Sequence, residues 1–261
     1  MAAEPRVLVT RPEGQADTLM QGLRRAGWCP IHLPLLRIEA IDPLPGAMRQ
    51  RVQDLDLYNH VLFISANAAR IGLACLEDFW PQWPDGQQYW AVGKSTADVL
   101  ESRGLRVRRP VSDMSSEGLL ALPGLANLAG QRCLVVRGEG GRTYLADVLG
   151  ERGAEVDALV CYRREAVSYS EHSLRERLAE GSVEAVMISS GEGLEILTRL
   201  LQNRERTNLP RATLFAPSER VASLASELGW SSVQTVENAS DSAMLAAAQQ
   251  WRDAYFREIQ I

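Results

Sequence analysis

Several polar turns, some of them containing glycine, follow short apolar runs of the sequence, and these turns are where chemistry is expected. One of them is "RGEGGR" at residues 137–142, which lies between the apolar run "CLVV" and a helical pattern. The backbone N–H groups and guanidinium of such a turn suit an anionic ligand. A dinucleotide fingerprint would need a third glycine where Thr143 stands, and the sequence has no Gly-Lys-Ser/Thr end of a P-loop. A nucleotide is therefore disfavoured. The alternative is that the glycines only let a strand turn into a helix.

The other expected strand ends also carry hydroxyl groups, glycines and a few cations. Together the turns suit a ligand whose carboxylates are spread over a wide surface. The candidate substrate-binding residues are Thr10, Arg11, Ser65, Asn67, Gly93, Thr96, Arg137, Gly138, Ser189, Ser190, Gly191 and Ser218. Both arginines have an alternative role as anchors where a helix begins, and Ser65, Ser189 and Ser190 have one as helix N-caps.

Metal and disulfide chemistry are not indicated. The four cysteines, Cys29, Cys75, Cys133 and Cys161, are far apart in the sequence, and none belongs to a Cys-x-x-Cys pair. The three histidines, His32, His60 and His172, form no metal-ligand spacing. The sequence also has no Gly-x-Ser-x-Gly nucleophile elbow, although this does not exclude a Ser-His-Asp triad. We therefore expect no metal site.

The elements that must position these turns occur twice. Residues 6–28 align without a gap on residues 132–154, and Arg11 then falls on Arg137. Each copy is a buried strand, a polar turn, an amphipathic helix and a second apolar run. Three further pairs follow in the same order: 61–73 with 185–197, 91–104 with 215–229, and 110–122 with 235–247. This repetition indicates a duplicated α/β domain with parallel sheets covered on both faces.

Two further segments, 35–41 and 161–167, alternate charged with apolar residues and lie between the domain-like blocks. They are predicted to be extended, and they could pair with each other as linker strands.

The chain has 261 residues and a formal net charge of −5, which disfavours nonspecific binding to nucleic acid or to an anionic membrane surface. No apolar run approaches the roughly 20 residues that span a bilayer. The first predicted strand begins at once, without a basic leader, so we expect a cytoplasmic protein. No coiled-coil pattern calls for an oligomer, and we expect a monomer.

The opening "VLVTRP", followed in order by "FISANA", "AVG-x-x-TA", "VRGEGGR-x-x-L" and "VCYRR", resembles the uroporphyrinogen-III synthase family. The sequence departs from the family pattern at "FAPSER", where an Ile-Gly turn is usual. The resemblance implies two flavodoxin- or Rossmann-like α/β domains, joined by a two-stranded antiparallel linker, with the active site in the cleft between them. The domains would be 1–37 with 166–261, and 38–165.

The resemblance also implies a reaction. The family closes the linear tetrapyrrole hydroxymethylbilane with loss of water and inversion of the terminal ring through a spiro intermediate, without a cofactor. Tyr162 matches the family tyrosine proposed to help the hydroxyl group leave, since a phenol can donate a hydrogen bond. The alternative role for Tyr162 is a packed linker aromatic. Two rival functions are a noncatalytic binding module for a small polycarboxylate and, less favoured, a nucleotide-dependent transferase.

Overall fold

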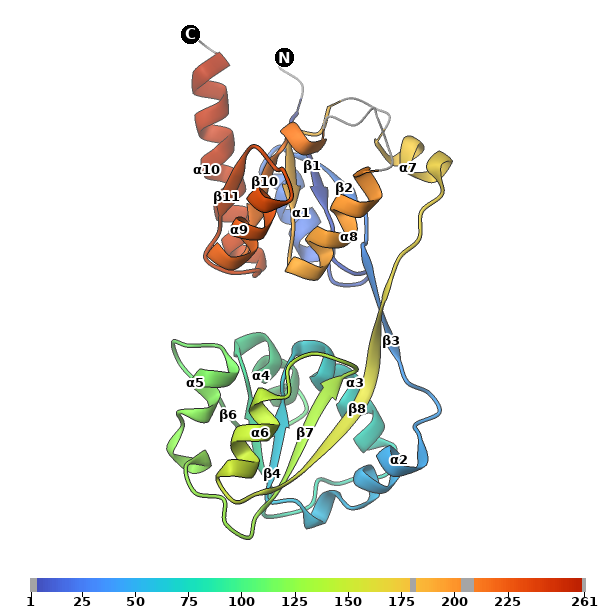
Figure 1. Cartoon of the computed structure of the whole chain (residues 1–261), viewed down its shortest axis with the longest axis vertical. Helices are drawn as coiled ribbons and strands as arrows, with labels where there is room; N and C mark the ends of the chain where they lie inside the picture. Colours follow the sequence, from blue (N-terminus) through green and yellow to red (C-terminus); the bar gives the residue numbers. More distant parts are fainter. Residues whose placement is uncertain (1–3, 179–181, 203–208, 260–261) are drawn as a thin grey trace. The chain divides into compact units, whose positions relative to one another are not determined.

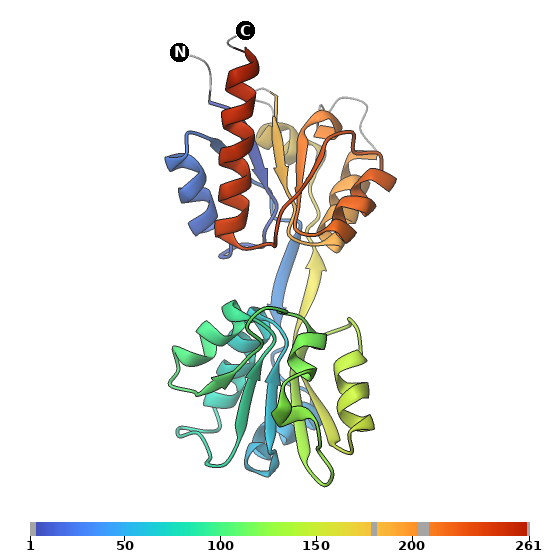
Figure 2. The ribbon, with the colours of Figure 1, turned by 90° about the vertical axis from the view of Figure 1, so that its left-hand side faces the viewer.

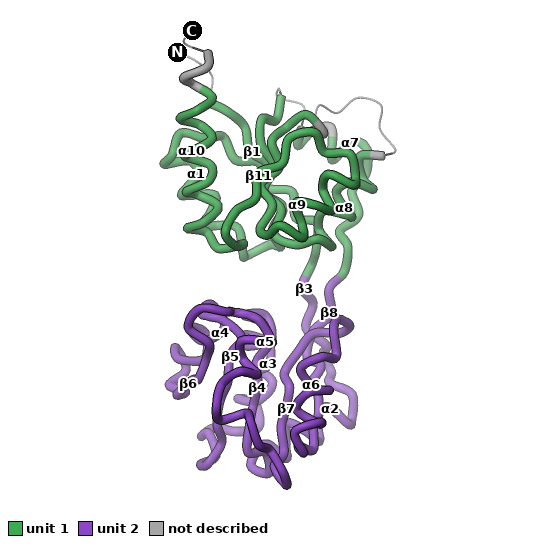
Figure 3. The backbone as a smooth tube through the Cα atoms, turned by 60° about the vertical axis from the view of Figure 1, so that its left-hand side comes forward, with its two compact units in different colours: residues 1–37, 165–261 green, residues 38–164 purple. Residues whose placement is uncertain are grey.

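The computed structural model describes residues 4–178, 182–202 and 209–259. The chain forms two compact units: unit 1 contains residues 1–37 and 165–261, and unit 2 contains residues 38–164 (Figure 3). The chain leaves unit 1 after its first two strands and returns to it from residue 165 onward. This division lies one residue before the expected 165/166 boundary.

Unit 1 is built on a five-stranded parallel sheet in the order β11-β10-β9-β1-β2 (Figure 1). Its three central strands, β1, β9 and β10, are short and largely buried, because a parallel sheet is covered on both faces, whereas the edge strands β2 and β11 are partly exposed. Figure 2 shows α1 and α10 over one face, and α8 and α9 over the other. The elements of unit 1 are β1 (Arg6–Val9), α1 (Asp17–Arg25), β2 (Cys29–His32), α7 (Glu171–Leu178), β9 (Ala185–Met187), α8 (Gly191–Gln202), η3 (Leu209–Arg211), β10 (Thr213–Ala216), α9 (Glu219–Glu227), β11 (Val233–Thr235) and α10 (Asp241–Ile259).

Unit 2 is built on a sheet in the order β3-β8-β7-β4-β5-β6, and the last five of these strands are parallel. One core cluster lies between the sheet and α2, α3 and α4, and another lies between the sheet and α5 and α6. The elements are β3 (Leu36–Ala40), α2 (Gly46–Gln53), η1 (Leu55–Leu57), β4 (His60–Phe63), α3 (Ala66–Glu77), β5 (Gln88–Ala91), α4 (Lys94–Glu101), β6 (Val107–Arg108), α5 (Ser116–Leu120), η2 (Pro123–Leu125), β7 (Arg132–Gly138), α6 (Tyr144–Glu151) and β8 (Glu155–Ala166).

The strands β3 and β8, which carry the two charged segments of the sequence, are neighbours in the sheet. The amide of Ile41 donates to the carbonyl of Cys161 (2.9 Å), and the amide of Val167 donates to the carbonyl of Leu35 (3.0 Å). The partner number falls as the residue number rises, which is the pattern of an antiparallel pair.

The two parallel sheets have the same order once the sequence repeat is applied. In unit 1 the order is β2-β1-β9-β10-β11, and in unit 2 it is β8-β7-β4-β5-β6. Each strand of one unit therefore occupies the place of its repeat in the other, and both orders are the flavodoxin-like 2-1-3-4-5. The prediction of two duplicated parallel-sheet α/β domains is confirmed.

Candidate functional site

The strand order gives each sheet one topological switch point. In a doubly wound sheet, ligands bind outside the carboxyl ends of the strands, where the strand order reverses. In unit 2 this switch point lies between β7 and β4, and in unit 1 it lies between β1 and β9. Of the sequence candidates, Gly138 and Ser65 lie at the first switch point, and Thr10 and Ser189 lie at the second.

A β-bulge in β8 brings Tyr162 to the switch point of unit 2. Arg137 of β7 pairs with Val160 of β8, but the next residue, Gly138, pairs with Tyr162, so Cys161 is an extra residue in β8. Side chains normally alternate between the two faces of a strand, and a bulge interrupts this alternation. Tyr162 therefore joins Cys161 in the core cluster that packs against α3, and only 6% of Tyr162 is exposed.

Gly138 provides the space for the ring of Tyr162. A Cβ atom at position 138 would lie 2.5 Å from Cζ and 2.6 Å from Cε2 of Tyr162. The backbone holds the same two strand ends together, because the amide of Glu139 donates to the carbonyl of Tyr162 (2.7 Å). Packing against Tyr162 thus requires a glycine at position 138, whether or not Gly138 also contacts substrate.

Ser65 completes this cluster. Its Oγ caps α3 by accepting a hydrogen bond from the amide of Ala68 (3.0 Å), and it lies 3.1 Å from the hydroxyl of Tyr162. Ser65 is half-buried, whereas Tyr162 is buried. The structure therefore joins two hydroxyl groups at the N-terminus of a 12-residue helix.

The remaining candidate serines lie at helix N-termini. Ser190 accepts from the amide of Gly193 (3.1 Å) at the start of α8, and Ser218 accepts from the amide of Val221 (3.4 Å) at the start of α9. The ungapped repeat paired Ser65 with Ser189, but the residue that caps a helix as Ser65 does is Ser190. The turn between β9 and α8 is one residue longer than the turn between β4 and α3. Ser65 and Ser190 therefore do cap helices, which is the alternative role that the sequence offered for them.

Several other candidates use their side chains inside their own unit. Thr10 is buried, and its Oγ1 donates to the carbonyl of Met187 (2.7 Å) across the switch point of unit 1. Arg11 forms an ion pair with Asp241 and donates to the carbonyl of Ala239, and only 13% of its side chain is exposed. The contacts of Arg11 therefore support its alternative role as an anchor, here for the start of α10.

Three candidates on unit 2 and one on unit 1 lie at helix starts. Thr96 is buried in the first turn of α4, and Gly93 is the N-cap of the same helix. Asn67, in the first turn of α3, accepts from Arg70 (3.1 Å). Gly191 is the buried first residue of α8. Their backbone N–H groups point out of the helix N-termini, so these positions suit anionic groups through the backbone.

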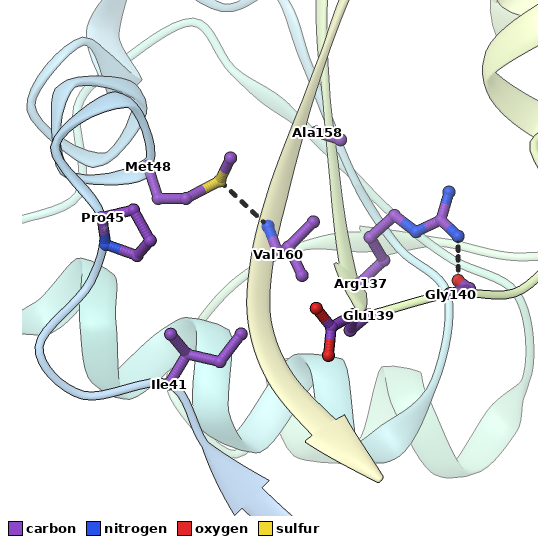
Figure 4. Close-up of a pocket in the computed structure, with 8 residues that line it drawn as sticks. All are labelled: Ile41, Pro45, Met48, Arg137, Glu139, Gly140, Ala158 and Val160. Atoms are coloured by element: carbon purple, nitrogen blue, oxygen red, sulfur yellow. Dashed lines mark hydrogen bonds between the residues drawn. The ribbon is translucent and has the colours of Figure 1, made fainter.

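Arg137 lines a pocket of about 340 Å³ on unit 2 (Figure 4). Its guanidinium donates to the carbonyls of Gly138 (3.2 Å) and Gly140. The other lining residues are Ile41, Pro45, Met48, Glu139, Gly140, Ala158 and Val160. The sequence singled out Arg137 but not this pocket, because its walls come from α2, β8 and the segment after β3, which only the fold brings together.

Histidine chemistry is not supported for His60, which lies at the opposite end of β4 from the switch point. His60 is buried at the start of β4, where its Nδ1 accepts from the indole of Trp90 (3.0 Å) and its Nε2 contacts Gln131. Burial lowers the pKa of His60 below its ordinary value of 6.5. An Nδ1 that accepts from an indole requires the neutral ring, so His60 serves the core.

Within the described parts of the chain, no group of three His, Cys, Asp or Glu side chains could hold a metal ion. None of the described helices is both long enough and apolar enough to cross a membrane.

Comparison with known proteins gives one family. The family model of uroporphyrinogen-III synthase HemD matches residues 6–246. The uroporphyrinogen-III synthase of Salmonella typhimurium is 36% identical over 245 residues, and that of Escherichia coli is 35% identical over 247 residues. Each alignment covers 93% of this chain and 99% of the relative.

Two solved structures share the fold. A mutant uroporphyrinogen III synthase from Thermus thermophilus has a TM-score of 0.57 at 20% identity, and the Helicobacter pylori uroporphyrinogen-III synthetase has a TM-score of 0.59 at 14% identity. Each comparison covers 95% of this chain and 99% of the other. Since the family model spans strands and helices of both units, and the bacterial relatives align over almost their whole length, the chain belongs to the uroporphyrinogen-III synthase family.

Proposed function

We propose that the chain is a lyase that converts hydroxymethylbilane into uroporphyrinogen III, with loss of water and inversion of the terminal pyrrole ring. The sequence relatives with this name support the activity. The structural observation that supports it most directly is the contact between the hydroxyls of Tyr162 and Ser65 at the switch point of unit 2. No comparable support exists for a noncatalytic binding module.

An anionic linear tetrapyrrole agrees with the hydrogen-bond donors that lie at the carboxyl ends of the strands. A linear tetrapyrrole carries acetate and propionate carboxylates at many points along its length. Because Arg11 is paired with Asp241, we expect these carboxylates to bind mainly to backbone N–H groups and hydroxyls at the starts of α3, α4, α8 and α9. The role of each of these residues in binding the substrate is a prediction.

The chemistry requires a hydrogen-bond donor rather than a strong acid. When the terminal hydroxymethyl group loses its hydroxide, the electron-rich pyrrole itself stabilises the cation that remains. The protein must help the hydroxyl depart and must hold the chain in the conformation that closes with inversion. We assign the first task to the Tyr162–Ser65 pair, whose neutral hydroxyls are hydrogen-bond donors.

We further propose that the enzyme acts as a monomer in the cytoplasm, without a cofactor and without a nucleic-acid or membrane partner. The free cysteines Cys29, Cys75, Cys133 and Cys161 agree with a reducing compartment.

An isomer assay tests the function. Hydroxymethylbilane is generated in situ, the purified protein is added, and the products are oxidised and separated into uroporphyrins I and III. Spontaneous closure gives isomer I, so a predominance of isomer III that disappears with heat-inactivated protein is expected. Formation of isomer I alone, at the uncatalysed rate, would refute the proposal. Saturable binding of the substrate under those conditions would then favour the binding module.

A further inference from the structure

The two residues whose hydroxyls meet at the switch point of unit 2 differ in burial, and this difference indicates which one faces the substrate. Tyr162 is 6% exposed and belongs to the core cluster under α3, whereas Ser65 is half-buried at the start of the helix. Among the residues that the structure describes, Ser65 is the one side chain whose hydrogen bond satisfies the hydroxyl of Tyr162 (3.1 Å).

A buried phenol proton needs an acceptor. If Ser65 donated to Tyr162, the phenol proton would be left without a partner in the core. The phenol of Tyr162 therefore donates to Oγ of Ser65. That oxygen also accepts from the amide of Ala68 (3.0 Å), so both of its lone pairs are used and its own proton is directed elsewhere.

We propose that Ser65 donates the hydrogen bond to the departing hydroxyl of the substrate, and that Tyr162 is the positioning residue that acts through Ser65. The inference rests on the proposed synthase function. Its basis is the chain of donors from the phenol of Tyr162 and the amide of Ala68 to Oγ of Ser65. Two donors on one hydroxyl strengthen its own donation, because hydrogen bonds in a chain polarise one another.

Every proton in the loss of water from the substrate is accounted for. The C–O bond of the hydroxymethyl group breaks, its electron pair stays on the oxygen, and the pyrrole nitrogen supplies electrons to the carbon. The oxygen leaves as water by taking the proton of Ser65, which is replaced by the proton of Tyr162. The phenolate recovers a proton from the ring carbon that loses one after the new carbon–carbon bond has formed.

A double-variant cycle in kcat for isomer III tests the inference. Ser65→Ala should lower kcat by roughly 10- to 100-fold, because it removes a hydrogen bond to a group that develops charge. Tyr162→Phe should lower kcat by the same factor or less, and the double variant should be no slower than Ser65→Ala. Ser65→Thr, which keeps a hydroxyl at this position, should restore most of the activity.

A matched variant separates this role from helix capping. Ser115 caps α5 of the same unit by accepting from the amide of Gly118 (3.0 Å). Ser115→Ala should lower Tm by about 2 to 4 °C, as the loss of a cap does, and should leave kcat unchanged.

Three results would overturn the inference. One is a Ser65→Ala variant with wild-type kcat beside a slow Tyr162→Phe variant, which would make Tyr162 the donor. Another is losses that multiply in the double variant, because the two hydroxyls would then act independently. The third is a folded Ser65→Thr variant as slow as Ser65→Ala. The Tm values of the free protein give an independent readout, since the shifts from Ser65→Ala and Tyr162→Phe should sum to more than the shift of the double variant.

These outcomes are distinct from a failure of the proposed function. If the wild-type protein forms no isomer III, the synthase proposal fails, while the Tm cycle still tests the hydrogen bond between Ser65 and Tyr162.

Discussion

Substitution of Gly138 by alanine provides the sharpest test of how the fold holds Tyr162. The added methyl carbon would lie 2.5, 2.6 and 3.0 Å from Cζ, Cε2 and Cε1 of the ring. Ordinary carbon–carbon contacts are about 3.5–4.0 Å, so the ring must retreat by roughly 1 Å. The backbone of Gly138 does not have a positive φ, and alanine is therefore not strained at this position by its own conformation.

The expected cost follows from this overlap. The ring of Tyr162 is buried in the core with Cys161 and Leu159, so it cannot retreat without displacing its neighbours. Such overpacking costs about 1–3 kcal/mol in the free energy of unfolding. A displacement of roughly 1 Å would also lengthen the 3.1 Å contact with Ser65 beyond a hydrogen bond, and misplacement on this scale can cost about 100-fold in rate.

Gly150→Ala is the matched control. Gly150 lies in α6 of the same unit, is exposed, and has no atom within 4 Å of a built Cβ. The same added methyl group should stabilise this variant by about 0.5–1 kcal/mol, because alanine favours the helix. Urea denaturation and the isomer assay would be run on both variants. A Gly138→Ala variant with wild-type unfolding free energy and wild-type formation of isomer III would refute the packing argument.

Two further outcomes concern electrostatics. Burial lowers the pKa of His60 in the folded protein below its ordinary value of 6.5. At a pH between the folded-state pKa and 6.5, the unfolded chain therefore binds more protons than the folded chain. The free energy of unfolding should then fall as the pH drops below 6.5. Urea midpoints at about pH 8 and about pH 5.5 should differ less in His60→Gln than in the wild type, and an equal difference would contradict the assignment of a neutral His60 beside Trp90. Asp241→Asn should lower the free energy of unfolding by about 1–3 kcal/mol, because it weakens a partly buried ion pair with Arg11, whereas Asp98→Asn on an exposed pair should cost about 1 kcal/mol or less. Equal losses in urea denaturation of these two variants would refute the anchoring role.

The sequence by itself determined the duplication and the class of fold. Apolar runs that alternate with helical patterns, repeated in the same order, are local signals, and the strands of residues 6–9 and 132–138 do occupy equivalent places in the two sheets. The sequence also selected Tyr162, Ser65 and Gly138, through the family resemblance and the polar turns. Both kinds of signal can be read from neighbouring residues, without knowledge of which strands become partners.

The tertiary structure alone decided how those residues meet. The direction of the Tyr162 side chain depends on a register shift between β7 and β8 that leaves Cys161 as an extra residue. No local sequence pattern predicts where such a β-bulge occurs. The partner of Arg11 lies 230 residues away in Asp241, so the sequence around Arg11 could not show that its charge is already paired. The helix cap of α8 is Ser190 rather than Ser189, because the loop after β9 is one residue longer than its repeat. The first two cases depend on contacts between parts of the chain that only the packing of the fold brings together, and the third depends on where β9 ends and α8 begins, which only the folded structure shows.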